Sequence, residues 1–248
     1  MEHESTFNYA EWDVYAQCYD TLTRLRPYAE MIAEVANLIP RGAKSVLDLG
    51  CGTGTLLARI NSIRKLQLTG LDNSPQMLAI AAKKLSNSPA KLQRGDLETM
   101  SDWGGPYDCV VSTNVLYTMN NPLLFLEHIR ETVKVGGTII VVTPKIGYDN
   151  GLILKAHCRD TRPDSFWRDP HRSPRREQRL IKEALGKSRL AKDMRTIAAH
   201  NRRIAGTGTF HFLTEQELRT LVHSAGLQLM DIHTTYADQN FLIVLTRE

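Results

Sequence analysis

Short apolar runs recur along the chain, and most are followed by a segment with helical spacing. Apolar residues dominate positions 45–49, 66–71, 107–113 and 138–143, and a shorter run lies at 90–94. Continuous runs of this length between turn residues predict strands that are buried on both faces. Successive strand, turn and helix units imply a parallel, doubly wound α/β sheet, with a ligand at the carboxyl ends of its strands.

Two further strands are predicted near the end of the chain, at 227–234 and 240–246. They follow a helix whose first turn contains Thr214 and Glu217, at the spacing of a capping box. Gly226 is expected to end that helix.

Two earlier helices also have clear boundary signals. Ser74 is placed as the N-cap of one, with Pro75 at its first helical position. The other begins at Asn121 and is expected to end at Gly136 and Gly137, just before the strand at 138–143.

Residues 147–209 interrupt the alternation of strands and helices. The segment contains no predicted strand, and from 177 to 204 it has the spacing of one or two basic amphipathic helices. We therefore expect a main domain over 1–146 and 210–248, with 147–209 inserted as a mobile lid that selects the substrate.

The insertion carries an excess of positive charge. Between Lys155 and Arg203 there are 15 Lys/Arg and 6 Asp/Glu, a net charge of +9, whereas the whole chain carries +4. Its first part is rich in arginine and proline, with arginines at 159, 162, 168, 172, 175 and 176. Arginine suits bidentate contact with carboxylate or phosphate, so an anionic partner is expected here.

The composition is that of a globular chain, with 248 residues of which 42% are hydrophobic. No apolar run approaches the ~20 residues that a membrane helix needs, and the N-terminus lacks the segments of a signal peptide. The cysteines at 18, 51, 109 and 158 form no C-x-x-C pair, which favours neither a disulfide framework nor a zinc site. A reducing cytoplasm is the expected location.

A glycine-rich turn follows the first strand. Gly50, Gly52 and Gly54 alternate directly after the apolar run, and Asp48 lies two residues before Gly50. Such a turn brings backbone amides and a helix N-terminus against a polar ligand, which a Cβ would block. The spacing differs from the G-x-G-x-x-G of dinucleotide-binding proteins. A glycine turn in some other α/β protein is the alternative interpretation.

The D-x-G-x-G-x-G pattern at 48–54 resembles the cofactor loop of class I S-adenosylmethionine (SAM) methyltransferases. The resemblance covers roughly 12–144 and 210–247, and it implies a seven-stranded sheet whose last strand is antiparallel. SAM would be the cofactor and S-adenosylhomocysteine (SAH) the product. Asp72 then matches the ribose ligand and Asp96 the ligand of the adenine amino group. Without the resemblance, Asp72 is only a carboxylate at a helix start.

The resemblance implies a set of cofactor-binding residues that follow the strand ends and the N-terminal helix. They are Tyr19, Asp48, Gly50, Cys51, Gly52, Gly54, Asp72, Asn73, Met77, Gly95, Asp96, Leu97, Thr113 and Asn114.

The N-terminal segment 7–37 has the spacing of two helices, the second starting after Pro27. Residues 12–20 read W-D-V-Y-A-Q-C-Y-D. This resembles the W-D-x-x-A-x-x-Y-D helix of small-molecule SAM methyltransferases, shifted slightly at the alanine. The resemblance places the helix over the cofactor with its tyrosine on the substrate side. Packing of the aromatic side chains in the core is the alternative interpretation.

Four residues are expected to bind the methyl acceptor, namely Tyr15, Asn114, Tyr117 and His211. Tyr19, Tyr117 and His211 are the candidates for a catalytic role, because a hydroxyl acceptor often needs a general base. His211 precedes a helix at the strand-end side of the sheet; a linker residue bonded to the backbone is its alternative role. No carboxylate cluster suggests a metal site.

Sequence motifs also limit the acceptor class. The residues after the fourth strand, from Asn114, lack the Asp/Asn-Pro-Pro-Tyr/Phe motif of base-directed amino methyltransferases, and no Pro-Cys nucleophile is present. A small, anionic acceptor is the first expectation, with methyl transfer to N, O or C left open. An RNA methyltransferase that uses the insertion to hold phosphates, or a SAM-binding subunit without chemistry, is the alternative. Oligomeric state is not predicted.

Overall fold

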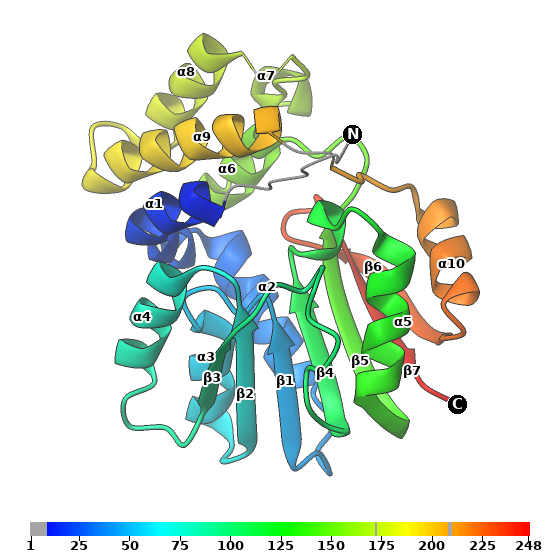
Figure 1. The fold of residues 1–248 in the computed structure, drawn as a ribbon. Helices are drawn as coiled ribbons and strands as arrows, with labels where there is room; N and C mark the ends of the chain where they lie inside the picture. Colours follow the sequence, from blue (N-terminus) through cyan, green and yellow to red (C-terminus); the bar gives the residue numbers. More distant parts are fainter. Residues whose placement is uncertain (1–8, 172, 208–209) are drawn as a thin grey trace, which may run out of the picture.

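The computed structural model describes residues 9–171, 173–207 and 210–248 (Figure 1). Within them, seven strands form one sheet in the order β3-β2-β1-β4-β5-β7-β6, in which β7 is antiparallel to both neighbours. The strands are β1 (Ser45–Leu49), β2 (Gln67–Asp72), β3 (Lys91–Arg94), β4 (Tyr107–Thr113), β5 (Val133–Pro144), β6 (Gln228–Thr235) and β7 (Asn240–Thr246). The predicted fold class, a seven-stranded, mostly parallel, doubly wound sheet, is confirmed.

Helices cover both faces of this sheet. One face is covered by α2 (Arg26–Leu38), α3 (Thr55–Ile63) and α4 (Pro75–Lys84), and the other by α5 (Pro122–Thr132) and α10 (Glu215–Ser224). Successive strand residues alternate between the two cores, as in β1, where Val46 belongs to the first and Leu47 to the second. The sheet is thus buried on both faces, which explains why its central strands are apolar throughout.

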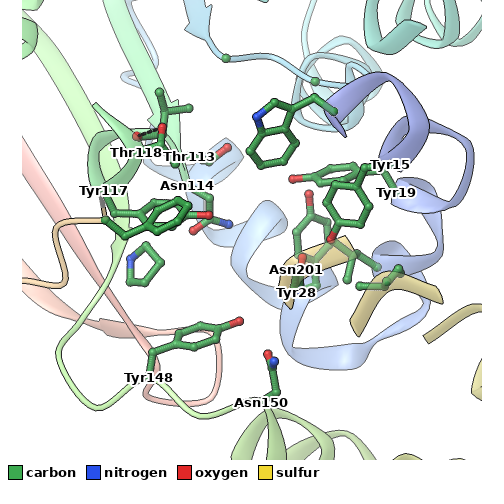
Figure 2. A pocket seen from close by; sticks show the side chains of 18 of the residues that line it. Tyr15, Tyr19, Tyr28, Thr113, Asn114, Tyr117, Thr118, Tyr148, Asn150 and Asn201 are labelled. Carbon is green, nitrogen blue, oxygen red and sulfur yellow. Dashed lines mark hydrogen bonds between the residues drawn. The ribbon is translucent and has the colours of Figure 1, made fainter. Parts of the chain in front are cut away.

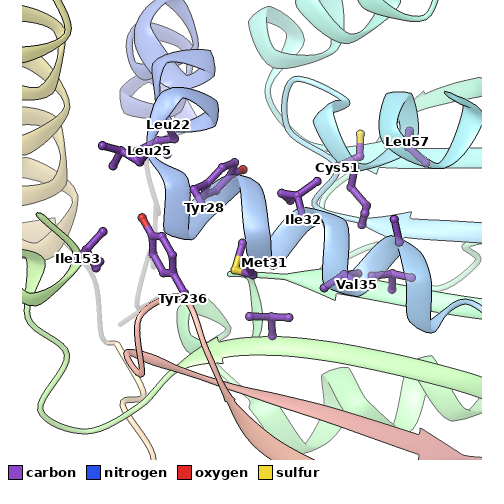
Figure 3. Packing of buried hydrophobic residues seen from close by; sticks show 14 of the residues in the cluster. Leu22, Leu25, Tyr28, Met31, Ile32, Val35, Cys51, Leu57, Ile153 and Tyr236 are labelled. Carbon is purple, nitrogen blue, oxygen red and sulfur yellow. The ribbon is translucent and has the colours of Figure 1, made fainter. Parts of the chain in front are cut away.

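Helix α2 links the core to the carboxyl end of the sheet. Its apolar residues recur at helical spacing, and Met31, Ile32 and Val35 pack against the sheet (Figure 3). One turn earlier, Tyr28 faces Tyr236, with ring centroids 6.0 Å apart. The same helix therefore anchors the fold and presents a tyrosine at the strand ends.

A further layer of helices lies above the carboxyl ends of the strands (Figure 1). It contains α1 (Tyr9–Tyr19), the 3-10 helix η1 (Asp20–Arg24), α6 (Asn150–Cys158), α7 (Asp164–Trp167), α8 (Pro174–Leu185) and α9 (Arg189–Thr207). Helix α9 packs against α1 and α8, and α6 packs against α2 and α8. The N-terminal helix and the inserted segment thus form one cap, although they are far apart in sequence.

The inserted segment is more regular than its sequence indicates. Neither α6 nor α7 is predicted from the pattern, and α8 begins at Pro174, before the predicted helical spacing starts at 177. Trp167 is fully buried, and a Cβ at Gly151 would overlap its carbonyl oxygen. This close contact, which needs a glycine, holds α7 against α6. Arg172 lies outside the described residues.

One predicted boundary is wrong. Helix α5 ends at Thr132, and β5 begins at Val133, so Gly136 and Gly137 lie inside the strand rather than at a helix end. Val133 pairs with Tyr107, and the β4–β5 register shifts before the next pair. Gly136 has φ +71° and donates its N–H to the Arg247 carbonyl at 2.7 Å. The strand has already begun at the buried, β-branched Val133, and Gly136 only forms a bend within it.

Other local predictions hold. The Ser74 hydroxyl caps α4 by accepting from the Met77 N–H, and Thr214 and Glu217 form the reciprocal capping box of α10. Across the described ranges, no helix has both the length and the apolar character needed to cross a bilayer.

Candidate functional site

A cavity of about 380 Å³ lies between the carboxyl ends of the strands and the helical cap. Its lining divides into two halves. One half is formed by the turns after β1, β2, β3 and β4, and the other by side chains from α1, α2, the inserted helices and the β6–β7 turn. We refer to these as the strand-end half and the cap half.

Most of the predicted residues line this cavity. The structure brings together, on its wall, Tyr15, Tyr19, Gly50, Gly52, Asp72, Asn73, Met77, Gly95, Asp96, Leu97, Thr113, Asn114 and Tyr117. Asp48, Cys51, Gly54 and His211 are not part of the lining.

The three loop glycines have different functions. All have positive φ, at +69° for Gly50, +52° for Gly52 and +72° for Gly54. A Cβ at Gly50 would overlap the Val115 side chain, and one at Gly54 would lie 3.0 Å from the Ala81 Cβ, so these two permit close packing. A Cβ at Gly52 meets nothing closer than 3.9 Å. Gly52 therefore leaves space for a ligand, whereas Gly54 supports the loop from behind.

Asp48 lies below the loop instead of on the cavity wall. It is 1% exposed, and its Oδ1 has no hydrogen-bond partner among the described residues. Burial, with a smaller contribution from the Asp72 charge, raises the pKa of Asp48 to about 8. The group is largely protonated at neutral pH, and a cation bound at the loop would favour its ionised form. The predicted direct ligand is thus a buried group that responds to charge in the loop.

Asp72 is fixed at the end of β2 by backbone donors. Its Oδ2 accepts from the Gly52 N–H at 2.8 Å, and its Oδ1 accepts from the Ser74 N–H at 2.9 Å. Burial raises its pKa, and these N–H bonds oppose the shift. The residue lines the cavity, and a carboxylate has about four acceptor positions in all. A preoriented carboxylate of this kind suits two neighbouring hydroxyl groups.

The turn after β3 supplies the next predicted group. Asp96 Oδ1 accepts from the Glu98 N–H at 2.9 Å, which leaves Oδ2 with no protein partner among the described residues. A Cβ at Gly95 would overlap Met100 Sδ, so a glycine is required for the turn. Asp96 and the adjacent Leu97 backbone can therefore present an acceptor and a donor side by side.

Asn114 follows β4 in a left-handed conformation, with φ +58°. Its N–H donates to the Val142 carbonyl at 2.8 Å, and its Oδ1 accepts from Asn240 Nδ2 at 2.7 Å. Asn240 is fully buried at the start of β7 and is absent from the sequence prediction. It fixes the Asn114 amide so that Nδ2 remains as a donor.

Both aspartates of the N-terminal motif have structural functions that the sequence did not reveal. Asp13 accepts from the Ser74 hydroxyl at 2.5 Å, and Asp20 accepts from the Thr53 hydroxyl at 2.6 Å and from Lys84 at 2.7 Å. They tie the N-terminal helix to the glycine loop and to α4, and so hold the cap over the strand ends.

Tyrosines dominate the cap half (Figure 2). Tyr28, Tyr148 and Tyr236 join the predicted Tyr15 and Tyr19 on the cavity wall. The Tyr19 ring meets Tyr15 edge to face, with ring centroids 5.1 Å apart. Burial raises the pKa of Tyr19 to about 12, and it also raises the pKa values of Tyr15, Tyr28 and Tyr236. These phenols are neutral at physiological pH and serve as donors and aromatic surface.

The structure does not support a catalytic role for His211. Its neighbours Phe210 and Phe212 line the cavity, and His211 does not, because side chains alternate along this extended segment. Its N–H donates to the Tyr117 carbonyl at 2.8 Å, and the Tyr117 ring stacks on Phe210. His211 fits the alternative role, that of a linker residue bonded to backbone.

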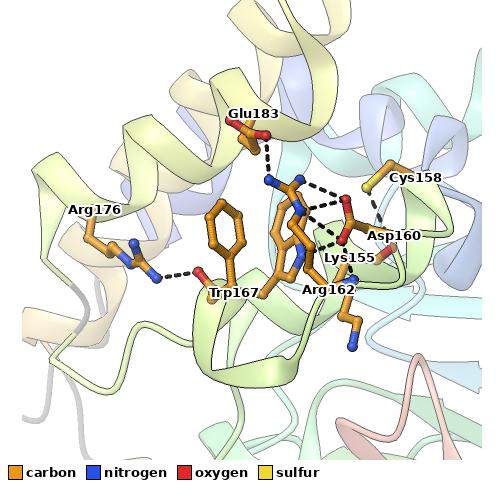
Figure 4. A network of polar contacts seen from close by, with 8 residues as sticks. Lys155, Cys158, Asp160, Arg162, Trp167, Arg176 and Glu183 are labelled. Atoms are coloured by element: carbon orange, nitrogen blue, oxygen red, sulfur yellow. Dashed lines mark hydrogen bonds and ion pairs between the residues drawn. The ribbon is translucent and has the colours of Figure 1, made fainter.

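Two side chains of the arginine-rich stretch, Arg162 and Arg176, make contacts within the inserted segment (Figure 4). Arg162 pairs with Asp160 and Glu183 and lies over the Phe166 ring, 4.0 Å from its centroid. Arg176 donates to the Phe166 carbonyl. The contacts of these two arginines therefore hold α7 against α8.

Charge is divided sharply between the inside and the outside of the cap. Within the described residues, the charged side chains of the cavity lining are one guanidinium, Arg202, and six carboxylates, namely Asp72, Asp96, Glu98, Asp149, Asp169 and Glu177. Arg202 is itself paired with Glu177. Seven cations of α8, α9 and the turn between them are exposed and do not line the cavity: Arg175, Arg179, Lys182, Lys187, Arg189, Lys192 and Arg195. The lining does not support the expected anionic acceptor.

Comparison with known proteins agrees with this geometry. A family model described as a methyltransferase domain matches residues 21–232. A tRNA U34 carboxymethyltransferase of Shewanella sp. is 29% identical over 135 residues, which is 53% of this chain and 41% of the relative. The chain spans about half the length, or less, of the curated relatives it matches first.

Two solved structures share the fold. One is a methyltransferase solved in complex with the Trm112 methyltransferase activator of Haloferax volcanii; it covers 96% of both chains, with a TM-score of 0.65 and 16% identity. The other is a TehB-like SAM-dependent methyltransferase from Corynebacterium glutamicum, covering 97% of this chain and 100% of its own, with a TM-score of 0.57 and 16% identity.

Proposed function

Because the chain belongs to the methyltransferase-domain family, we propose that it is a SAM-dependent methyltransferase that acts on a small molecule by direct in-line transfer. One observation carries the proposal. Most of the residues expected to bind the cofactor line one half of a cavity of about 380 Å³, and aromatic and aliphatic side chains form the other half. Cofactor and acceptor would thus share one water-poor space.

The strand-end half fits the cofactor in chemical detail. Asp72 can accept hydrogen bonds from both ribose hydroxyls, and Asp96 with the Leu97 backbone can meet the adenine edge. Gly52 leaves room for the cofactor to approach the loop backbone. The Asp48 Oδ1, which has no hydrogen-bond partner among the described residues, favours a positive group at the loop. When bound, the cofactor supplies a methyl group on a sulfonium, and the electron pair of the breaking C–S bond stays on sulfur.

The cap half determines which acceptors can react. Its tyrosines are neutral, and no histidine lines the cavity within the described ranges. The remaining candidate bases among the described lining residues are carboxylates, which are weak bases. The protein therefore contributes mainly positioning and exclusion of water, which suffice for a nucleophile that needs little proton removal. Amine nitrogen or activated carbon fits this site better than an ordinary alcohol.

RNA is the second candidate acceptor, and the exposed cations of α8 and α9 favour it. Such a face can bind a phosphate backbone, and a relative is named for a tRNA substrate. The acidic lining weighs against bringing phosphates into the cavity. Binding to RNA that weakens steeply with added salt, together with methylation of that RNA, would replace the small-molecule proposal.

The direct test is calorimetric titration of the protein with SAM and SAH. We expect binding by the wild type, and Asp72→Ala should weaken it by roughly 1–3 kcal/mol, since the ribose hydroxyls lose their partner. Asp102→Ala removes an exposed carboxylate from the loop before β4 and is the matched control. Binding of NAD without SAM would contradict the proposed function, as would equal SAM affinity in the two variants. A SAM-binding subunit without chemistry would bind normally but transfer no methyl group to any acceptor.

A further inference from the structure

The cap half of the cavity has an apolar and aromatic wall. Tyr15, Tyr28 and Tyr236 are each at least nine-tenths buried and line it together with Leu180 and Ile197 (Figure 2). Tyr15 and Tyr19 meet edge to face at 5.1 Å, and Tyr28 and Tyr236 do so at 6.0 Å. Tyrosine rings offer apolar area, and their electron-rich faces also attract a positive charge.

Where the inserted segment lines the cavity, carboxylates outnumber cations, so the local charge is negative. Glu177 pairs with Arg202 and accepts from Asn150 Nδ2 at 3.4 Å. Asp149 accepts from the N–H groups of Gly151 and Asp169, at 2.8 and 2.7 Å, and these two bonds hold its carboxyl group in place. With Asp169, three carboxylates face one guanidinium. Burial raises the pKa of Glu177, and the Arg202 charge opposes that shift.

This lining is opposite in sign to the protein as a whole. The chain has a net charge of +4, and the exposed faces of α8 and α9 are basic, yet the same helices turn Glu177 and Arg202, a neutral pair, toward the cavity. Low-dielectric walls concentrate the field of the remaining carboxylates inside the chamber. An anion would enter against this field, without a free cation to meet it among the described lining residues.

We propose that the methyl acceptor is a largely apolar amine that carries an aromatic ring system. It can enter as a neutral molecule or as a cation, and it reacts as the neutral amine; a cation first gives its proton to a lining carboxylate or to solvent. This inference rests on the proposed methyltransferase function. It replaces the anionic acceptor that the basic insertion indicates from sequence. Aromatic walls hold the ring system, and the carboxylates of the insertion side attract the amine.

The experiment compares three probes of one shape on the SAH-saturated protein, by calorimetry: 2-naphthylmethylamine, 2-naphthylmethanol and 2-naphthoate. We expect the amine to bind at least ~10-fold more tightly than the carboxylate, with the alcohol between them. Glu177→Gln leaves Arg202 without its partner and should reduce this preference or reverse it. Glu183→Gln makes the same charge change on α8, but outside the cavity, and should leave the preference unchanged.

Three results would overturn the proposal: tighter binding of the carboxylate by the wild type, an equal shift in preference for the two glutamate variants, or no binding of any probe. Circular dichroism and thermal unfolding of Glu177→Gln show whether that variant is folded. Arg202→Gln gives an independent test, because it removes the cation and should increase the preference for the amine. Failure of SAH itself to bind would instead contradict the underlying function.

Discussion

The two halves of the cavity are built in different ways. The strand-end half is made from turns within residues 48–114, where backbone N–H groups fix the carboxylates of Asp72 and Asp96. The cap half is made from side chains that come from both ends of the chain and from the insertion, such as Tyr28 and Tyr236. Local backbone geometry forms the first half, and tertiary packing forms the second.

In physical terms, we expect this difference to separate binding of the cofactor from choice of the substrate. A turn that requires glycine and an anchored carboxylate tolerates few substitutions. A wall of packed aromatic and aliphatic side chains can change shape by exchange of single residues. We therefore expect variants of the strand-end half to affect SAM binding, and variants of the cap half to affect the acceptor.

The largest effect is expected at Gly50. Alanine there would overlap Val115 and would need φ +69°, which together cost about 2–5 kcal/mol. SAM affinity, measured by calorimetry, should fall by ~30-fold or more because the loop must move. Gly42→Ala, where a Cβ meets nothing within 4 Å, is the control. Full SAM affinity in Gly50→Ala would show that the loop does not form the binding site.

A smaller, pH-dependent effect is expected at Asp48. Its pKa of about 8 in the folded chain lies above its ordinary value near 4, so the protonated form stabilises the fold. This stabilisation is complete below about pH 4 and is lost as pH rises through about 8. Asp48→Asn mimics the protonated group, so in the ligand-free protein it should become more stable than the wild type by at least ~1 kcal/mol near pH 8.

Urea unfolding at several pH values measures this difference, with Asp102→Asn as an exposed control. A stability difference between Asp48→Asn and the wild type that is the same at every pH would contradict the assigned pKa. Added SAM should reduce the difference, because a positive group at the loop favours the ionised Asp48.

The smallest effect is expected in the cap half, at Tyr28. Phenylalanine removes a buried hydroxyl of the cavity wall that can hydrogen-bond to the acceptor, a loss of about 0.5–1.5 kcal/mol. Affinity for 2-naphthylmethylamine should fall ~2–10-fold, while SAM affinity stays the same. Tyr107→Phe, whose hydroxyl bonds the Trp103 carbonyl away from the cavity, is the control. If Tyr28→Phe lost affinity for SAM but bound 2-naphthylmethylamine as tightly as the wild type, the proposed division of tasks between the two halves would be contradicted.

The same division explains what the sequence could predict. Strands, helix caps and the glycine loop depend on residues close in sequence, so Asp72, Asp96 and Asn114 could be placed before the structure was known. Tyr148 and Tyr236 lie in loops without a motif, and only the fold brings them together. His211 was predicted to face the substrate because it lies near the strand ends in sequence. Its position in the sequence does not tell which way its side chain points, and the structure places Phe210 and Phe212 on the cavity wall instead.

The insertion shows the limit most clearly. Its net charge was visible in the sequence, but the pairing of Arg162 with Asp160 and of Arg202 with Glu177 depends on how α6, α7, α8 and α9 pack. An amphipathic pattern tells which face of a helix is polar, whereas the neighbours decide which charges face a cavity. This is why an insertion with a net positive charge places mainly carboxylates in the cavity lining.

The central claim is that one cavity holds the cofactor at the strand ends and the acceptor under the cap. A crystal structure of the protein grown with SAH tests it most directly. We predict that the ribose hydroxyls contact Asp72, the adenine lies beside Asp96 and Leu97, and the sulfur faces Tyr19 and the tyrosine wall. SAH bound elsewhere, or with its sulfur directed away from the cap half, would contradict the account.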